Sequence, residues 1–412
     1  MRFAIVVALC AAGPLTTRAG DWKEFRGPDG TGRYEGPVLP LKWGPDTNVA
    51  WKADVPGLGW SSPILVKGRL FLTTAVEKGD AYSLRALAFD AATGQPLWDK
   101  ELFVEDKKTV PQPHKKNSHA SPTPVSDGEK VWVHFGHMGT ACFDFAGNLL
   151  WSSQKHPYKP MNGNGGSPIL VGDKVVFITE GTDVQAVVSL DKSTGKEAWK
   201  SYRTGSKAFM TISFTTAQAA QVNGKTQVLA AGSDYVAGYD PADGAELWRA
   251  KYPAGGFSLV CRPVIGHGFA FISTGYSTAH LIAVPLDGTG DVSSRIAWTS
   301  KNKAPLTPTP LLAGELLYTV SDQGYLTCYD AKTGKIHYQE QLKGTLYSAS
   351  PILANDKVVY VTSENGVGTA FAFGTEFKTL GGGDLREKTF ATFVPDDGAL
   401  YVRTESKLYK FK

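Results

Sequence analysis

Short apolar runs alternate with polar turns along almost the whole chain. A typical stretch opens with a small residue and a proline before an apolar run, as in "SSPILV" and "GSPILV". A polar turn follows, then a second apolar run such as "KVVFITE", and then two more runs separated by a turn. Apolar runs this short, bounded by Gly, Asp and Pro, predict β strands rather than helices. Each stretch therefore predicts four antiparallel strands, the form of one blade of a β-propeller.

The turn before the fourth strand carries a repeated pattern. The segments "AFDAATGQPLW", "CFDFAGNLLW", "SLDKSTGKEAW", "GYDPADGAELW" and "CYDAKTGKIHY" return at intervals of roughly 40 to 50 residues, a period typical of propellers and solenoids. The Asp side chain can bond the backbone of its own turn, and the glycine supplies a residue with positive φ. The tryptophan that closes the turn is expected to lie buried between neighbouring blades. These tryptophans are Trp98, Trp151, Trp199, Trp248 and Trp298.

Seven units and one divided unit account for residues 48–412. The C-terminal tail predicts three strands and lacks a fourth, whereas "NVAWKADV" near the N-terminus predicts a strand without a unit of its own. Pairing the two completes an eighth unit and removes exposed sheet edges. We therefore predict an all-β, eight-bladed propeller of four-stranded antiparallel blades, in which the N-terminal strand completes the C-terminal blade. Residues 20–47 are rich in Gly and Pro, and predict an irregular segment before this single domain.

The first residues predict a secretory signal. The stretch "MRFAIVVALCAAGPLTTRAG" has a basic start, a short apolar run, and Thr17 and Ala19 placed as a cleavage site. The apolar run is shorter than the roughly 20 residues of a membrane-spanning helix. We predict a signal peptide over residues 1–19 and a periplasmic or secreted protein. A lipoprotein is not predicted, because Leu9 stands before Cys10 where a lipid-attachment site needs a small residue.

Composition and charge narrow the classes further. Of the 412 residues, 42% are hydrophobic and 20% charged, which is typical of a folded protein with a sizeable core. The net charge is +4, and the densest basic run, Lys107 to Lys116, lacks the interleaved aromatic residues of a nucleic-acid surface. We predict a solvated loop there and no nucleic-acid partner. Cys142, Cys261 and Cys328 remain after the signal and form no C-x-x-C, so neither a disulfide framework nor a zinc site is predicted.

The repeat resembles that of a known family. The pattern A-x-D-x-x-T-G-x-x-x-W, complete at Ala88–Trp98 and nearly so at Ser189–Trp199, resembles the repeat of pyrroloquinoline quinone (PQQ) dehydrogenases. It is also similar to the propeller lipoprotein that assists outer-membrane β-barrel assembly, and the whole mature chain looks like secreted PQQ-like propellers of planctomycete type. The resemblance implies the fold, and fold alone does not supply the function.

The resemblance also raises a cofactor question. A PQQ dehydrogenase would be expected to bring two adjacent cysteines, calcium ligands and long insertions between blades. This sequence has no adjacent cysteines, and its repeats fill almost the whole mature chain. We therefore predict no cofactor and no metal site, and keep PQQ with calcium as the alternative.

Candidate site residues follow from the strand order of such propellers. The loops that lead into each blade and the loops between its second and third strands share one face, at the mouth of the central channel, which is the default ligand site. The polar or aromatic residues predicted at this face are Arg262, His119, Lys207, Glu180, Asp183, Asp234, Tyr276, His280, Asp322 and Glu364, together with Asn162 and Asn164.

Four of these residues carry specific hypotheses. Arg262 replaces the Ser or Thr that precedes the proline elsewhere, and it is either a clamp for a carboxylate, sulfate or phosphate or a salt-bridge partner of a neighbouring blade. His119 is either an acid or base near neutral pH or a hydrogen-bonded structural histidine. Asp322 and Glu364 follow matching second strands, so they form either a carboxylate pair or ordinary turns.

These observations predict a binding protein rather than an enzyme. The leading hypothesis is a monomeric, non-catalytic scaffold of the envelope whose channel mouth engages a protein or a glycan. The alternative is an enzyme with its site at the central channel, either a PQQ-dependent oxidoreductase or a polysaccharide lyase or hydrolase.

Overall fold

The computed structural model describes residues 21–276 and 279–412. The predicted signal peptide, residues 1–19, lies outside the described residues. Within the described ranges the protein is all-β, with three short 3-10 helices beside its strands. No helix in these ranges is long and apolar enough to span a membrane.

The strands form eight sheets, numbered here in chain order. Sheet 1 holds β4 (Ile64–Val66), β5 (Arg69–Lys78), β6 (Ala81–Asp90) and β7 (Pro96–Asp106); sheet 2 holds β8 (Val125–Ser126), β9 (Lys130–His134), β10 (Thr140–Asp144) and β11 (Leu149–Ser153). Sheet 3 holds β12 (Ile169–Val171), β13 (Lys174–Glu180), β14 (Gln185–Asp191) and β15 (Glu197–Tyr202); sheet 4 holds β16 (Gln218–Val222), β17 (Lys225–Ala231), β18 (Tyr235–Tyr239), β19 (Glu246–Lys251) and the short β23 (Gly290–Asp291).

The remaining sheets follow the same order. Sheet 5 holds β20 (Val264–Gly266), β21 (Phe269–Ser273), β22 (Leu281–Pro285) and β24 (Trp298–Ser300); sheet 6 holds β25 (Leu311–Ala313), β26 (Leu316–Val320), β27 (Tyr325–Asp330) and β28 (Ile336–Gln341). Sheet 7 holds β29 (Ile352–Ala354), β30 (Val358–Thr362), β31 (Val367–Ala372) and β32 (Thr379–Asp384), with β1 (Arg33–Tyr34) and β2 (Lys42–Trp43) at its edges; sheet 8 holds β33 (Val394–Asp396), β34 (Ala399–Arg403), β35 (Lys407–Phe411) and β3 (Val49–Asp54).

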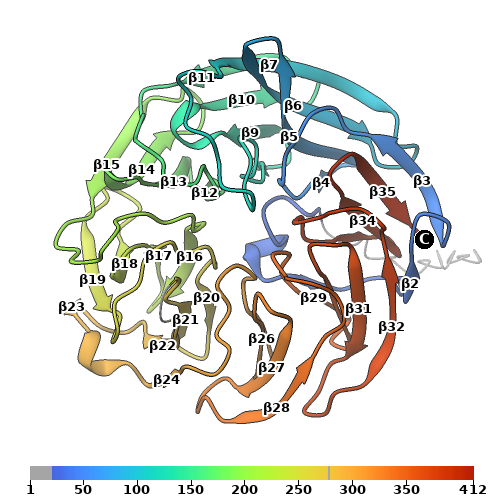
Figure 1. The fold of residues 1–412 in the computed structure, drawn as a ribbon. Helices are drawn as coiled ribbons and strands as arrows, with labels where there is room; N and C mark the ends of the chain where they lie inside the picture. The colour runs from blue at the N-terminus through green and yellow to red at the C-terminus, as the bar shows by residue number, and fades with distance from the viewer. Residues whose placement is uncertain (1–20, 277–278) are drawn as a thin grey trace, which may run out of the picture.

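The sheets lie around a common centre, as Figure 1 shows, and this arrangement is consistent with a propeller. The predicted pairing of the two chain ends is present. Strand β3 pairs antiparallel with β35, with Val49 opposite Phe411 and Asp54 opposite Lys407. The last sheet is therefore built from both ends of the chain.

Each Asp-x-x-Thr-Gly turn is held by its own side chains, as predicted. Asp90 Oδ1 accepts hydrogen bonds from the backbone N–H and the hydroxyl of Thr93, at 2.8 and 2.9 Å. In the equivalent turn of sheet 3, the hydroxyls of Ser193 and Thr194 lower the pKa of Asp191 to about 2. These bonds shape the hairpin that joins the third and fourth strands.

The glycine of each turn also packs on a tryptophan of the preceding sheet. Gly195 has φ 69° and lies so close to the indole ring of Trp151 that a Cβ atom would come within 2.5 Å of it. The Trp151 Nε1–H donates a 3.0 Å hydrogen bond to the carbonyl of Lys192 in the same turn. Equivalent indole bonds reach the next sheet from Trp51, Trp98, Trp199 and Trp298. The repeated turn therefore contributes hydrogen bonds and packing contacts that hold each of these sheets against the next one.

The N-terminal segment, of which the structure describes residues 21–47, contains short regular elements that the sequence did not predict. It contains the 3-10 helix η1 (Pro28–Gly30), and β1 and β2 add in parallel to β29 and β32. Strands of two residues are too short to show an alternation of apolar and polar residues in the sequence. They are held by backbone pairing with the edges of sheet 7 and not by burial of an apolar face of their own. The other 3-10 helices are η2 (Gly136–Met138) and η3 (Ser293–Arg295).

The core lies between adjacent sheets. One cluster, for example, joins Trp132 and Cys142 of sheet 2 to Val175, Phe177 and Val188 of sheet 3. The second and third strands of sheet 3 are almost wholly buried, while an outer strand such as β3 alternates half-buried and exposed side chains. Cys142, Cys261 and Cys328 are buried free thiols.

Candidate binding site at the channel mouth

A ring of eight residues surrounds the centre of the molecule, one from the loop that leads into each sheet. Its members in chain order are Ser62, Thr123, Ser167, Thr216, Arg262, Thr309, Ser350 and Thr392. The backbone N–H of one member donates to the side-chain hydroxyl of the next, over 2.9 to 3.1 Å, at seven positions. The last of these bonds runs from Thr392 back to Ser62. The ring lacks the link from Thr216 to Arg262, because arginine has no hydroxyl.

The seven hydroxyl members of the ring line a cavity of about 710 Å³. Part of the remaining cavity wall is apolar. Phe209 and Tyr276 are 85% and 58% exposed, and Met161 is 38% exposed. The Phe257 ring lies between the first two, with centroids 6.3 Å from Phe209 and 5.7 Å from Tyr276. We call these four side chains the apolar rim; of them, only Tyr276 was predicted from the sequence.

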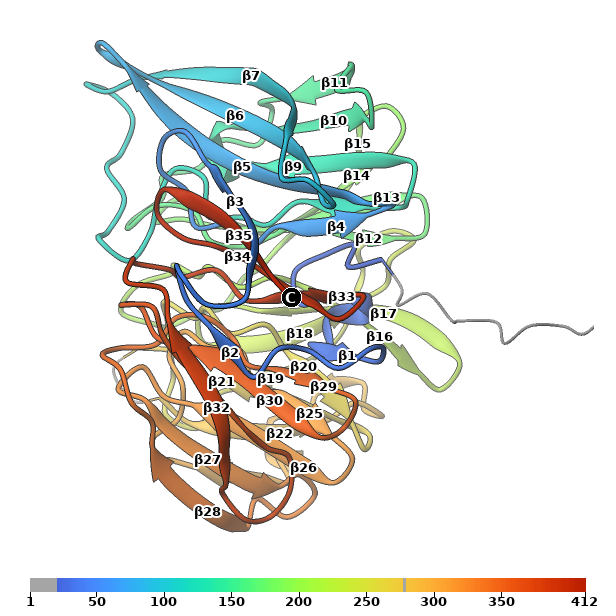
Figure 2. The same ribbon diagram turned by 90° about the vertical axis from the view of Figure 1, so that its right-hand side faces the viewer.

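The far end of the channel is closed by the N-terminal segment. Phe25 lines the cavity, and the guanidinium of Arg262 donates to the Phe25 carbonyl and to Glu24 Oε2, both at 2.8 Å. Arg26 in turn donates to the carbonyls of Thr309 and Pro310. Figure 2 shows β1 toward the face opposite the loop that follows β7.

The structure gives Arg262 an internal partner. Its side chain is 2% exposed, is not part of the cavity wall, and pairs with Glu24. This partner belongs to the N-terminal segment and not to a neighbouring blade, and its contact could not be predicted from a Gly-rich and Pro-rich sequence. Burial raises the pKa of Glu24, although Arg262 opposes the rise. Burial and the nearby Arg262 lower the pKa of Arg26 to about 9.

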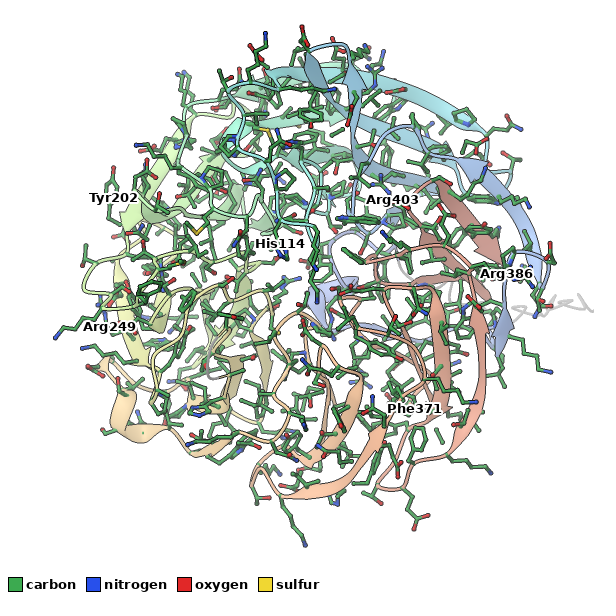
Figure 3. All side chains as sticks on the ribbon, viewed as in Figure 1. His114, Tyr202, Arg249, Phe371, Arg386 and Arg403 are labelled. Atoms are coloured by element: carbon green, nitrogen blue, oxygen red, sulfur yellow. The ribbon has the colours of Figure 1, made fainter. Side chains whose placement is uncertain are left out.

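The loop of residues 107–117, which we call the strap, runs from sheet 1 across the channel mouth. Figure 3 shows His114 near the centre of the ring of sheets. Lys116 Nζ lies 3.0 Å from Asp322 Oδ2 and 2.9 Å from Glu364 Oε1. The strap is therefore not simply a solvated loop, because its last lysine makes ion pairs with sheets 6 and 7. Burial lowers the pKa of Lys116, but these two carboxylates outweigh the effect and raise it.

A second cavity of about 730 Å³ lies on the other side of the strap. Its walls include Glu364, His119 and the rings of Tyr82, Trp60 and Phe390. The Trp60 and Phe390 rings lie 4.3 Å apart between centroids. His119 is 6% exposed and its ring packs 4.4 Å from that of Tyr82. Burial and the nearby His137 lower the pKa of His119 to about 4, so the ring is neutral at physiological pH.

The structure therefore brings together part of the predicted set. Asp322, Tyr276 and Asn162 line the mouth cavity, and Glu364 and His119 line the second cavity. Asp322 and Glu364 meet on Lys116, a residue that sequence reasoning had left in a solvated loop. The remaining candidates, Arg262, Lys207, Glu180, Asp183, Asp234, His280 and Asn164, line neither cavity.

Some of the remaining candidates have internal partners. Glu180 is buried and its Oε1 lies 2.5 Å from the Nε of buried Arg203. Asp183 and Asp234 accept backbone N–H bonds from Lys159 and Lys207, at 2.8 and 2.6 Å. These bonds stabilise loops, which is the ordinary role of Asp in turns. The side chain of His280 is buried, and burial lowers its pKa.

The residues at the mouth do not fit a PQQ and calcium centre. PQQ carries several carboxylates, yet the one lysine on the mouth cavity wall already pairs with Asp322 and Glu364. Among residues 21–276 and 279–412, no group of three or more His, Cys, Asp or Glu side chains could hold a metal ion. The wall of this cavity consists mainly of Ser and Thr hydroxyls and apolar side chains, with few charged groups.

Comparisons with known proteins agree with the fold. The sequence profile of the family described as "Outer membrane protein assembly factor BamB" matches residues 85–295 and 288–375. Among solved structures, the chain is similar to BamB from Moraxella catarrhalis, with a TM-score of 0.60 and 11% identity over 88% of this chain and 97% of that one. A search of curated protein sequences finds no significant match.

Two dehydrogenases are also structurally similar. A europium-containing methanol dehydrogenase gives a TM-score of 0.66 at 11% identity, covering 95% of this chain and 98% of that one. The quinohemoprotein alcohol dehydrogenase from Comamonas testosteroni gives 0.55 at 13% identity, covering 97% and 81%. At these identities the likeness concerns the fold, which is shared by binding proteins and enzymes.

Proposed function

Because this chain belongs to the family described as the outer membrane protein assembly factor BamB, we propose that it is a non-catalytic binding protein of the cell envelope. Its ligand is an apolar segment of a partner polypeptide, held at the channel mouth. The signal over residues 1–19 sends the protein to the periplasm or the exterior, where residues 48–412 act as one monomeric domain.

In this proposal the eight sheets are the eight blades of a closed propeller. Two sets of contacts support closure. The hydrogen-bonded ring runs from Ser62 through the other loops and returns from Thr392 to Ser62. The pairing of β3 with β35 removes two strand edges that would otherwise be exposed. A closed ring gives the mouth a rigid frame, which limits the entropy lost on binding.

The apolar rim is the observation that carries the proposal. Phe209, Phe257, Tyr276 and Met161 gather beside one cavity, and Phe209 exposes 85% of its surface. Large exposed apolar groups that cluster at a concave site mark interaction surfaces, and aromatic side chains supply most of the binding energy at such sites. Methionine adapts its shape to varied apolar partners. This composition favours polypeptide side chains over the polar surface of a glycan.

The polar groups at the mouth are engaged in structure, which supports a non-catalytic role. Asp322 accepts bonds from the Leu306 and Thr307 backbone, from the Thr307 hydroxyl and from Lys116. His119 remains neutral down to about pH 4. An acid or base catalyst works best with a pKa near the working pH and a free reach to the substrate.

A binding titration tests the proposal. The probe is a fluorescent peptide of alternating Phe, Leu and Ser, added to wild-type protein and to the double variant Phe209→Ser, Tyr276→Ser. We expect the variant to lose on the order of tenfold or more in affinity, because each removed aromatic anchor costs about 1 to 2 kcal/mol. The matched control is Val104→Ser, which removes a 60% exposed apolar side chain from the outer strand β7.

The same protein is then tested against the rival functions. An oligosaccharide panel is screened for binding and degradation, and a dye-linked alcohol oxidation is followed after addition of PQQ and calcium. Turnover in either assay, or peptide binding that the double variant does not weaken, overturns the proposal.

A further inference from the structure

The two cavities at the mouth adjoin one another. Five residues line both of them, namely Trp60, His114, Lys116, Asn117 and Phe390. Three of the five belong to the strap, so the strap is the partition between the cavities. Each cavity, at about 710 and 730 Å³, has the size of a site for a small molecule or a few amino-acid residues. A ligand longer than that reaches from one cavity into the other.

Lys116 stands where such a ligand crosses. It lines both cavities, whereas Asp322 lines only the mouth cavity and Glu364 only the second. Its ammonium lies 3.0 Å from the first carboxylate and 2.9 Å from the second, and so holds the end of the strap across the junction. Within the described residues, no other side chain of the strap forms an ion pair with sheets 6 and 7.

The junction carries an excess of negative charge. The Asp322 and Glu364 side chains are 8% and 12% exposed, and they share one ammonium of which 26% is exposed. Glu364 accepts one further bond, from the Ser348 hydroxyl at 2.7 Å. A ligand that displaces Lys116 without supplying a cation leaves two poorly solvated carboxylates without a counterion, which is costly even though Asp322 keeps its bonds from Leu306 and Thr307. A ligand with its own basic side chain replaces the ion pairs and releases Lys116 to water.

We infer that the two cavities form one groove for an extended polypeptide, and that Lys116 holds in the free protein the position that a basic side chain of the ligand takes in the complex. The inference rests on the proposed function and adds to it the length and charge of the segment recognised. The mouth cavity takes apolar side chains on the rim, and the second cavity takes the next residues beside Trp60 and Phe390. The Lys116 side chain turns away to open the passage, while His114 and Asn117 remain in the wall of the groove.

Three fluorescent peptides test this inference by titration. The first is a short apolar peptide that fills the mouth cavity alone. The second extends it by a lysine and a further apolar stretch, and the third replaces that lysine by norleucine, which keeps the aliphatic chain and removes the charge. The proteins are wild type and Lys116→Met, with Lys108→Met as matched control, because Lys108 is an exposed lysine of the strap that lines neither cavity and forms no ion pair within the described residues.

We expect the long lysine peptide to bind wild type on the order of tenfold more tightly than the norleucine peptide, as for a hydrogen-bonded charged group. Lys116→Met should raise the affinity for the lysine peptide further, because the protein's own ammonium no longer competes. Lys108→Met should not change the affinity for any of the three peptides.

The outcomes separate the two proposals. Binding of the short peptide that is lost in Phe209→Ser, Tyr276→Ser, with no gain from length or lysine, overturns this inference and leaves the proposed function standing. Absence of short-peptide binding overturns both. Because the peptide comparison on wild type needs no variant, instability of Lys116→Met does not remove the test.

Discussion

The backbone N–H of Thr392 donates a 3.0 Å hydrogen bond to the Oγ of Ser62, 330 positions earlier in the chain. Both residues occupy the same place, just before the innermost strand of their own sheets, and six bonds of the same kind link the other members of the ring. The ring therefore joins the first and last sheets at the centre, while the β3 and β35 pairing joins the two chain ends within sheet 8. Stability should depend on both.

The first prediction concerns the closing bond of the ring. Ser62→Ala leaves the buried Thr392 N–H without its acceptor, and an unpaired buried donor costs about 1 to 3 kcal/mol. We expect a loss of this size in the free energy of unfolding, measured by urea denaturation. Ser152→Ala is the matched control, because Ser152 is exposed on β11. Equal stability of the two variants would contradict the role assigned to the ring.

The second prediction concerns the closed end of the channel. Arg262→Ser removes the partner of Glu24, whose side chain is 18% exposed. Breaking a buried ion pair from one side costs about 3 kcal/mol or more. The double variant Glu24→Gln, Arg262→Ser should recover part of that loss relative to the single variant, because Gln carries no charge that would be left without its partner. Urea denaturation measures both, and a double variant no more stable than the single one would argue against this account.

The strands and turns could be predicted because their signals are local. The Asp, Thr and Gly of each turn bond and fold within a few residues, and the tryptophan that follows at a fixed spacing packs on the next turn. The eighth sheet could be predicted for the same reason, since "NVAWKADV" has the pattern of a strand and the C-terminal tail lacks the fourth strand of its unit. Alignment of the repeats predicted that Arg262 takes the place of the Ser or Thr before the proline, but it did not predict that Arg262 pairs with Glu24.

The parts of the site that sequence reasoning missed depend on contacts between distant segments. Lys116 reaches Asp322 across 206 positions, and nothing in the basic run around Lys116 indicates which carboxylates it meets. Glu180 was a candidate by position, but Arg203 satisfies it inside the core. Phe209 lies in a loop without a repeat pattern, so only the structure shows that it joins Tyr276 and Phe257 at the rim.

The third prediction concerns the joining of the chain ends. Trp51 on β3 donates its indole N–H to the Ala91 carbonyl at 3.2 Å, packs on Gly94, and lies 5.9 Å from Tyr401 between ring centroids. Trp51→Ala removes these contacts and leaves a cavity between sheets 8 and 1, so we expect a loss of about 3 kcal/mol. Thermal and urea denaturation measure it. Leu97→Ala is the control, because Leu97 is 45% exposed on β7 and should change stability little.

The last prediction is a dependence of stability on pH that arises from His134. This residue is 2% exposed, and its Nδ1 lies 2.8 Å from the Thr140 hydroxyl. Burial, with a contribution from the nearby His156 and His137, lowers its pKa from 6.5 to about 3.

The sign follows from proton uptake. At a pH between the two pKa values, His134 is protonated in the unfolded chain and neutral in the folded protein. The contribution of His134 to the free energy of unfolding is therefore fully present above about pH 6.5 and falls as the pH decreases toward 3, by up to about 1.4 kcal/mol per pH unit for one such group. His119, with a pKa of about 4, acts in the same direction.

His134→Gln removes one titrating group, so the stability of this variant should fall less steeply between about pH 6.5 and 4.5 than that of wild type. It should be less stable than wild type near neutral pH, since the hydrogen bond to Thr140 is altered, and the gap should narrow on acidification. Guanidinium denaturation at several pH values measures the slope, with the exposed His337→Gln as control. If His134→Gln and wild type lose stability in parallel, the buried neutral histidine is not the origin of the acid sensitivity.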